Sequence, residues 1–421
     1  MGRRTGKFVK ILGLIAALAV MAVGTSVPAQ RLLAFPGRLD EVQGQNITVP
    51  WSRWLPLTIA ADHQKPRIIS GAQVIKMEAP KAGHYWVRLR LFGWIPFRGV
   101  PVDVMRPQYV IPGGESLGIV AHTQGVMVTG FESIYIRGRA SDPAVQAGIE
   151  RGDVILRVDQ RPVANVKVLQ ERIAQDGSRQ KAVHLLVQGA RTDHERTVMP
   201  LWYDHAWQIG VVVQDKTSGV GTLTFYNGVT GQYTALGHSI SDGLTRRPVS
   251  LSTGRVTGAD IVGVVPATQS QPGQKVGILA GPGNVSGTAG FNGRFGVVGR
   301  LDHRPVLGPQ EALPLALPDQ VHPGPAKLVT VLAGQVPKTF TIDILKTAPQ
   351  YSPEVKGIMF KVTDPKLLQH TGGIIQGMSG SPIIQNGRVV GAVTHVLVNR
   401  PNLGFGCYAY WMASQKSYRG L

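Results

Sequence analysis

The chain has 421 residues, with 52 Gly, 29 Pro and a single Cys. Its length predicts two or three domains, and the Gly and Pro content favours short strands and tight turns over long helices. One cysteine excludes an internal disulfide. The net charge of +19 favours either an anionic membrane surface or plain solubility, and the absence of zinc-finger spacing or an RNP-like motif argues against nucleic acid.

The first segment, residues 1–30, has the composition of an export signal. A basic stretch, MGRRTGKFVK, precedes 13 apolar residues, ILGLIAALAVMAV, and then GTSVPAQ. This order is typical of a secretory signal, with Val27-Pro28-Ala29 as a candidate cleavage site. A retained membrane anchor through residues 8–28 is the alternative, although a span needs about 20 apolar residues.

Residues 31–106 are predicted to form a β-rich module without chemistry of its own. The run YWVRLRLFGWIPFRGVPVDV alternates apolar and polar residues, and Gly93 and Pro96 interrupt it. Such a pattern predicts a β-hairpin.

Residues 107–203 resemble a PDZ domain of the type attached to bacterial proteases. The matching pieces are PAVQAGIERGDVILRVDQ, a helix-like VKVLQERIAQDG, a strand-like AVHLLVQG, and the loop Ser116-Leu117-Gly118-Ile119. The resemblance implies that an extended peptide adds to a sheet edge, with its terminal carboxylate held by the amides of that loop. A spacer domain with a disused groove is the alternative.

Residues 204–421 contain many short apolar runs separated by turn residues, among them QIGVVVQD, GTLTFYN, KTFTIDILK and VVGAVTHVLV. This pattern predicts a β-barrel or sandwich. The Gly-rich segment from Ala267 to Gly296 is expected to be mobile.

The motif Gly377-Met378-Ser379-Gly380 contains a candidate nucleophile, although a GxSG sequence by itself is a weak signal. Glycines on both sides of a serine permit a tight turn that exposes the hydroxyl. The same turn aims the amides of Gly377 and Ser379 at one point, as an oxyanion hole requires. An ordinary Gly-Ser turn is the alternative.

A nucleophilic serine needs a base and a group that orients the base. His238 follows a strand-like run and a glycine, while His395 lies in a strand close to the serine in sequence. Asp364 ends a strand 15 residues before Ser379, and Asp302 and Asp242 are competing acids.

The stretch IMFKVTDPKLLQHTGGIIQGMSGSPIIQNGRVVGAVTHVLVNRPNLGFGCYAYW closely resembles the sporulation stage IV B peptidase family, as do IGVVVQDKTSGVGTLTFYNGVTGQYTALGHSISD and GWIPFRGVPVDV. The resemblance implies a mostly β fold: an N-terminal β module, a PDZ-like α+β domain and a trypsin-like β-barrel peptidase domain. It implies Ser379 as nucleophile, His238 as general base and Asp364 as acid. No metal or other cofactor is expected.

The family resemblance also implies a biological role. The enzyme would act in the space between the two forespore membranes, cleave a membrane-bound regulator, release sigma-factor processing and cleave itself near its N-terminus. Its partners would be a protein substrate at a membrane surface and its own N-terminal segment.

The sequence departs from the family in the basic segment GLTRRPVSLS after GHSISD and at Arg400. The short spacing from Asp364 to Ser379 also keeps Asp302 open as the acid. Two other functions remain: a non-catalytic PDZ scaffold, and an HtrA-like quality-control protease, a group that usually has its PDZ domain after the catalytic domain.

Overall fold

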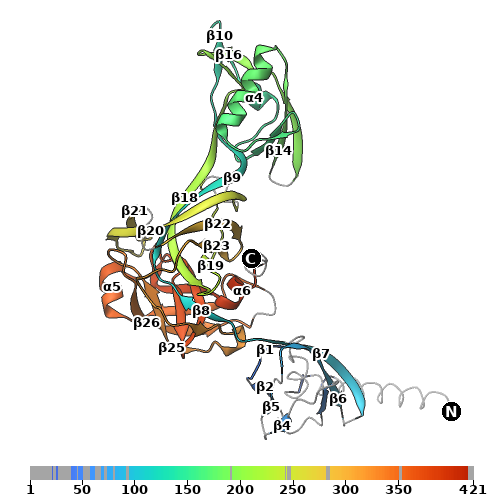
Figure 1. Cartoon of the computed structure of the whole chain (residues 1–421), viewed down its shortest axis with the longest axis vertical. Helices are drawn as coiled ribbons and strands as arrows, with labels where there is room; N and C mark the ends of the chain where they lie inside the picture. Colours follow the sequence, from blue (N-terminus) through green and yellow to red (C-terminus); the bar gives the residue numbers. More distant parts are fainter. Residues whose placement is uncertain are drawn as a thin grey trace, which may run out of the picture. The chain divides into compact units, whose positions relative to one another are not determined.

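The chain divides into two compact units after Gln108 (Figure 1). The computed structural model describes residues 39–44, 46–50, 57–61, 68–70, 74–78, 81–91, 94–189, 192–241, 243, 248–280, 285–349 and 353–415, with Met21, Thr25 and Ser26. The candidate cleavage site and Gly93 lie outside these residues. No helix among the described residues is long and apolar enough to cross a membrane.

The first unit consists of two small sheets, as the prediction of a β module required. One sheet has the order β1-β7-β6-β3 and the other β2-β5-β4. The predicted hairpin is formed by β6 and β7, whose inward side chains Val87, Leu89, Val100 and Val102 are buried. The strands are β1 Leu39–Val42, β2 Asn46–Pro50, β3 Leu57–Ala61, β4 Ile68–Ser70, β5 Val74–Glu78, β6 Gly83–Leu91 and β7 Ile95–Met105.

The second unit contains a first barrel of six strands. β9, β20, β22, β23, β19 and β18 pair in that order, and pairing between β9 and β18 closes the ring. Leu117, Ile119, Leu223, Tyr233 and Val297 fill its core. The strands are β9 Ser116–Phe131, β18 Val211–Tyr226, β19 Gln232–Leu236, β20 Leu251–Val265, β22 Ser286–Gly293 and β23 Gly296–Leu301, flanked by β8 Tyr109–Pro112, β21 Gln274–Leu279 and β24 Leu313–Pro314.

An α+β region, residues 126–209, is inserted into the first barrel. The long strands β9 and β18 each run through both parts, as their continuous ribbons show in Figure 1. The region contains β10 Ile134–Ile136, β11 Arg139–Ser141, α3 Pro143–Gln146, β12 Val154–Val158, β13 Arg161–Pro162, α4 Val166–Ser178, β14 Val183–Gln188, β15 Asp193–Val198, β16 Leu201–Tyr203 and β17 Ala206–Gln208. The expected boundary between a PDZ-like domain at residues 107–203 and a peptidase domain at residues 204–421 stays a prediction, and β9 of the first barrel lies before it.

Local signals explain how the inserted region folds. Asn165 caps α4, since its side chain accepts a hydrogen bond from the amide of Val168. Leu169 and Ile173 of that helix are buried with Val126 and Val128 of β9. The region thus has a core of its own while sharing strands with the barrel.

The second barrel is closed by β25-β26-β27-β30-β29-β28. Its strands are β25 Gly324–Thr330, β26 Lys338–Thr347, β27 Ile358–Val362, β28 Pro382–Gln385, β29 Arg388–Leu397 and β30 Arg400–Tyr408, and its helices are η1 Pro318–Gln320, α5 Pro365–Thr371 and α6 Ala409–Ala413. Two six-stranded barrels and an α+β domain confirm the expected fold class, which is mostly β.

Candidate active site

The serine motif forms a tight turn between α5 and β28 of the second barrel. Gly377 and Gly380 have φ angles of +90° and +92°, which residues other than glycine rarely adopt. Ser379 is half-buried, whereas Met378 and Ser381 on either side are fully buried. The turn therefore brings Ser379 toward the surface while its neighbours anchor it.

Two amides of this turn have no hydrogen-bond partner in the part of the chain that the structure describes: those of Gly377 and Ser379. The amides around them all donate to backbone carbonyls, namely those of Gln376, Met378, Gly380 and Ser381. Buried or half-buried amides are rarely left unpaired. Two unpaired amides flanking one residue are the arrangement that an oxyanion hole needs.

The directions of these two amides are fixed by the carbonyls of the same peptide planes. The Gln376 carbonyl accepts from the Lys275 amide at 2.9 Å, and the Met378 carbonyl accepts from the Ser381 amide at 2.9 Å. Because a trans peptide points its N–H opposite to its C=O, both N–H groups are held in place before any substrate binds.

The first barrel holds the same turn through Thr222 of β18. Its amide donates to the Ser379 carbonyl at 3.0 Å, and its hydroxyl donates to the Gly377 carbonyl at 2.8 Å. The side chain of Thr222 is completely buried. The turn therefore lies where the two barrels meet.

His238 follows the end of β19 in the first barrel. Leu236 and Gly237 before it have φ angles of +74° and +72°. A positive φ at a bulky buried leucine is a strained conformation of the kind found at functional sites. His238 Nδ1 lies 3.0 Å from the Ser239 carbonyl oxygen. Since a carbonyl only accepts, Nδ1 carries the proton and Nε2 is left as the proton acceptor.

The segments that carry His238 and Ser379 pack directly against each other. A Cβ on Gly380 would lie 2.4 Å from the Leu236 nitrogen, and a Cβ on Gly237 would lie 3.1 Å from the Val393 carbonyl oxygen. No side-chain hydrogen bond joins His238 to Ser379 among the described contacts, as is common before substrate binds.

A second histidine lies beside the first. The rings of His238 and His395 are 5.9 Å apart, centroid to centroid. Burial, then the nearby charges of His238 and Lys356, lowers the pKa of His395 to about 4. His395 is therefore neutral near pH 7.

None of the described contacts joins Asp364 to His238. It is the N-cap of α5: Oδ1 accepts from the amides of Lys366 and Leu367, and Oδ2 accepts from the amide of Thr341 at 3.3 Å. The group that holds His238 Nδ1 is a backbone carbonyl instead. The role of Asp364 as the acid remains a prediction, and its structural role is a helix cap.

Replacing Asp364 separates these two roles. Asp364→Ala should lower the free energy of unfolding by about 1 kcal/mol, because the cap is lost, whereas Asp364→Asn should change it by much less, because Asn caps equally well. Thermal unfolding of both variants measures this. If the two variants had the same unfolding temperature, capping by residue 364 would not contribute to stability. A large loss of activity in a stable Asp364→Asn would assign the carboxylate to His238.

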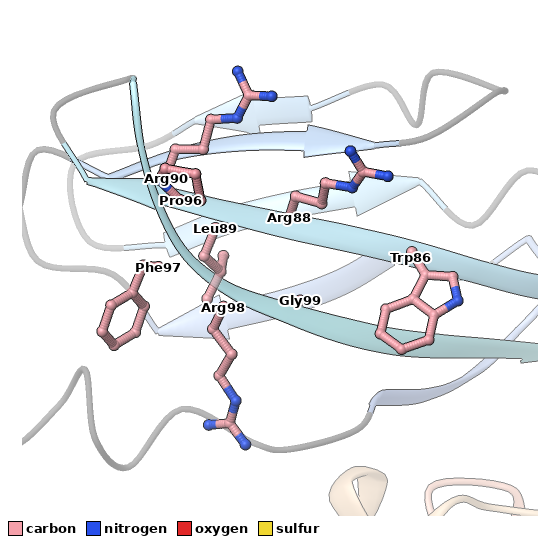
Figure 2. Close-up of a pocket in the computed structure, with 8 residues that line it drawn as sticks. All are labelled: Trp86, Arg88, Leu89, Arg90, Pro96, Phe97, Arg98 and Gly99. Atoms are coloured by element: carbon pink, nitrogen blue, oxygen red, sulfur yellow. The ribbon is translucent and has the colours of Figure 1, made fainter.

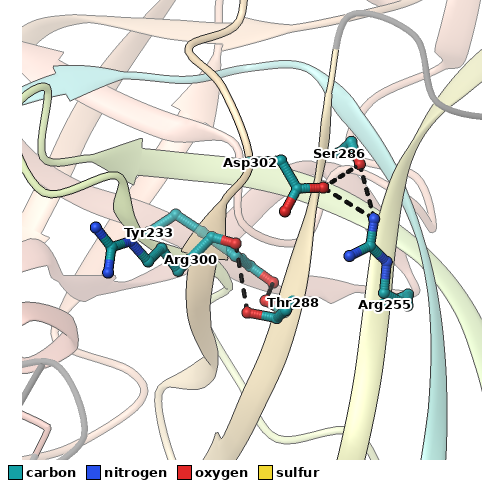
Figure 3. A network of polar contacts seen from close by, with 6 residues as sticks. All are labelled: Tyr233, Arg255, Ser286, Thr288, Arg300 and Asp302. Atoms are coloured by element: carbon teal, nitrogen blue, oxygen red, sulfur yellow. Dashed lines mark hydrogen bonds and ion pairs between the residues drawn. The ribbon is translucent and has the colours of Figure 1, made fainter.

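Asp302 lies at the wrong end of its strand to orient His238. Leu236 pairs with Gly296 at one end of β23, and Asp302 follows the other end, about 20 Å away along the strand. Its carboxylate instead accepts from Ser286 Oγ at 2.6 Å and Arg255 at 2.8 Å (Figure 3). Those bonds hold the pKa of Asp302 below its usual value. Asp242 lies outside the described residues.

The expected peptide-binding loop, Ser116, Leu117, Gly118 and Ile119, is not a loop. These residues lie in β9, paired on one side with β18 and on the other with β20. Their backbone groups form hydrogen bonds with these strands of the first barrel, and Ser116 and Leu117 are buried. The assignment of this loop to carboxylate binding is therefore corrected, because augmentation needs a free edge.

Cys407 is buried, and burial raises the pKa of its thiol to about 12. It is a packing residue next to the Gly237 carbonyl, 3.6 Å away. Among the described residues there is no cluster of three His, Cys, Asp or Glu side chains that could hold a metal ion.

Four residues around the turn could not be assigned a role from the sequence: Thr222, Lys275 and Thr330, from three strands, and Ser381, from the turn itself. Hydroxyl residues are common in strands, and a strand lysine usually faces solvent. Only long-range pairing between segments distant in sequence brings them together.

Comparison with known proteins identifies two families that this chain matches. A family model described as SpoIVB peptidase S55 matches residues 205–413, and a PDZ domain model matches residues 110–188. No curated protein sequence matches the chain.

Solved structures of Rv3671c from M. tuberculosis show a distant likeness. The active form of that protease is 14% identical over 48% of this chain and 75% of its own, with a TM-score of 0.27. An inactive form is 14% identical over 48% and 85%, with a TM-score of 0.24.

The residues that match the family model include the turn around Ser379, the strand end before His238 and all strands of the second barrel. The chain is therefore a serine peptidase of the SpoIVB peptidase S55 family that carries a PDZ domain.

Proposed function

We propose that this peptidase is exported, acts during sporulation between the two forespore membranes, and cleaves both a membrane-bound regulator and itself. The observation that carries the catalytic part is the pair of unpaired amides at Gly377 and Ser379, beside the strand end that bears His238. Membership of the SpoIVB family supports the sporulation role.

The geometry supports a conventional acyl-transfer mechanism. Ser379 Oγ attacks the scissile carbonyl carbon while His238 Nε2 takes the hydroxyl proton. The amides of Gly377 and Ser379 stabilise the negative oxygen of the tetrahedral intermediate. His238 then gives the proton to the leaving amine, and water hydrolyses the acyl-enzyme by the same steps. The Ser239 carbonyl holds Nδ1–H throughout.

Comparing the purified wild-type chain with Ser379→Ala tests the proposal, with self-cleavage and cleavage of co-expressed membrane proteins as readouts. Equal cleavage by both, or none by the wild type, would favour a non-catalytic scaffold. Broad digestion of unfolded casein would favour an HtrA-like quality-control role instead.

We also propose that the PDZ domain binds either the chain's own N-terminal segment or the terminus of the target. In the described sheet, β9 is flanked on both sides within the domain, by β12 and β18. The outermost strand is β15, whose far edge is free for an added strand. Deleting residues 107–203 would also remove β8 and β9 from the first barrel, so point changes along β15 are needed.

The hairpin of the first unit supports action at a membrane surface. Arg88, Arg90 and Arg98 line a groove with the aromatic rings of Trp86 and Phe97, which are 54% and 37% exposed. Figure 2 shows the guanidinium groups extending away from the hairpin. Exposed aromatics beside arginines are typical of surfaces that bind anionic lipid headgroups.

Reversing one of these charges should weaken membrane binding. We expect Arg90→Glu to bind vesicles of phosphatidylcholine mixed with phosphatidylglycerol at least about fivefold more weakly, because each basic residue near the surface contributes about 1 kcal/mol. Co-sedimentation at several salt concentrations measures this. Arg300→Glu, the same charge change on the exposed side of β23, is the control. Equal weakening by both variants would mean that net charge alone is responsible.

A further inference from the structure

A lysine lies buried beside the turn that carries Ser379. Lys275 of β21 is only 7% exposed, and its Nζ lies 2.8 Å from Thr330 Oγ1 and 3.3 Å from Ser116 Oγ. No carboxylate pairs with it in the described part of the chain. Burial lowers the pKa of its amine to about 7. A buried amine without an acid is costly to stability, which suggests that another property retains it.

A chain of hydroxyl groups leads from this amine to the turn. Thr330 Oγ1 lies 3.0 Å from Ser381 Oγ, which lies 3.5 Å from Thr222 Oγ1, the long limit of a hydrogen bond. Thr222 Oγ1 in turn donates to the Gly377 carbonyl at 2.8 Å. The amine at one end donates and the carbonyl at the other accepts, so these hydroxyl groups connect Lys275 with Gly377 through hydrogen bonds.

The backbone and stem of the same lysine hold the other side of Gly377. The Lys275 amide binds the Gln376 carbonyl, which fixes the peptide plane of the Gly377 N–H. A Cβ on Gly377 would lie 3.1 to 3.3 Å from three carbons of the Lys275 stem. One residue thus contacts the peptide before Gly377, the glycine itself and, through hydroxyls, its carbonyl.

We infer that Lys275 is a positioning residue for the oxyanion hole: its backbone amide holds the peptide plane of the Gly377 N–H, and its amine, through the hydroxyls, holds the carbonyl of Gly377 in the next plane. The inference rests on the proposed catalytic role of Ser379. Lys275 bridges Ser116 of the first barrel and Thr330 of the second, so it also fixes the barrels against each other at the site.

The test is Lys275→Met, which keeps an apolar stem and removes the amine. Full-length wild type and variant are labelled with an alkyl fluorophosphonate probe, which forms an Oγ–P bond to a reactive serine with loss of fluoride. The limiting labelling rate and the half-saturating probe concentration are measured separately. Losing one oxyanion donor costs about 10²- to 10³-fold, so misaligning one should lower the limiting rate about 10- to 100-fold and leave the half-saturating concentration within about twofold.

Thermal unfolding distinguishes positioning from general structural damage. Because the variant no longer buries an unpaired amine, its Tm should equal or exceed that of the wild type. Lys361→Met, a change at an exposed lysine of β27, is the matched control and should alter neither quantity. A limiting rate within about twofold of the wild type, or a lowered Tm that accounts for the lost rate, would overturn the inference.

A second variant keeps the inference testable if Lys275→Met does not fold. Thr222→Val keeps the shape of the side chain and removes the hydroxyl that binds the Gly377 carbonyl. It should lower the limiting labelling rate at least about 10-fold, and an unchanged rate would contradict the hydroxyl chain. If wild-type Ser379 is not labelled at all, the proposed function fails; if it is labelled and Lys275→Met is labelled equally fast, only the inference about Lys275 fails.

Discussion

Ser379→Ala should abolish peptide-bond cleavage, with a fall of about 10⁴- to 10⁶-fold in kcat, because the other hydroxyl of the turn, that of Ser381, is completely buried. The two unpaired amides would remain, but they act only on charge that an attacking oxygen creates. The purified variant should also lack the self-cleavage proposed for the wild type. It should also give no fluorophosphonate adduct at this position by peptide mass spectrometry.

The matched control for this prediction is Ser218→Ala, which removes a hydroxyl from an exposed position of β18. It should cleave and be labelled at the wild-type rate. Cleavage by Ser379→Ala at a comparable rate would mean that another residue is the nucleophile. Cys407 is a poor substitute, because its thiol is buried and stays protonated near neutral pH.

His238→Ala should cost nearly as much, because a serine hydroxyl is a weak nucleophile without a base to take its proton. We expect a loss of about 10⁴-fold or more in kcat, with little change in Tm, since the ring is only half-buried. Steady-state kinetics on a peptide that the wild type cleaves measures the loss. The labelling rate of Ser379 should fall in parallel.

His395→Ala separates the two neighbouring rings. His395 is neutral above about pH 4, so its removal should lower kcat less than about 10-fold and leave any pH dependence between pH 5 and 8 in place. The unfolded chain takes up a proton near pH 6.5 that the folded chain resists. The wild type should therefore lose stability relative to His395→Ala as the pH falls from 6.5 to about 4. A larger loss of activity from His395→Ala than from His238→Ala would mean that His395, and not His238, is the general base.

The nucleophile turn could be predicted because its chemistry is local. Glycines at 377 and 380 adopt positive φ angles, and their spacing around a serine is visible in the sequence. The β-rich fold could be predicted from the same kind of signal, since alternation and turn residues act over a few positions. The hairpin of β6 and β7 is an example.

The remaining features depend on pairing between distant segments. The run Ser116 to Ile119 resembles a PDZ loop locally, yet β18 and β20 enclose it from positions about 100 and 140 residues later in the chain. Asp364 ends a strand and precedes a proline, and that pattern fits a helix cap as well as a triad acid. Lys275 is buried only because its strand binds the turn at Gln376.

The two strands that the inserted domain shares with the first barrel have a mechanical consequence. A peptide-binding domain on a flexible linker would transmit no force to its neighbour when it binds. Here, a force on Val211 to Gln214 acts along the same backbone that reaches Thr222 beneath the nucleophile. Transferring this domain alone to another enzyme would break two ladders of hydrogen bonds between strands. A change that disrupts the PDZ domain of this protein should therefore also disrupt its catalytic centre, and the two should be inherited as one unit.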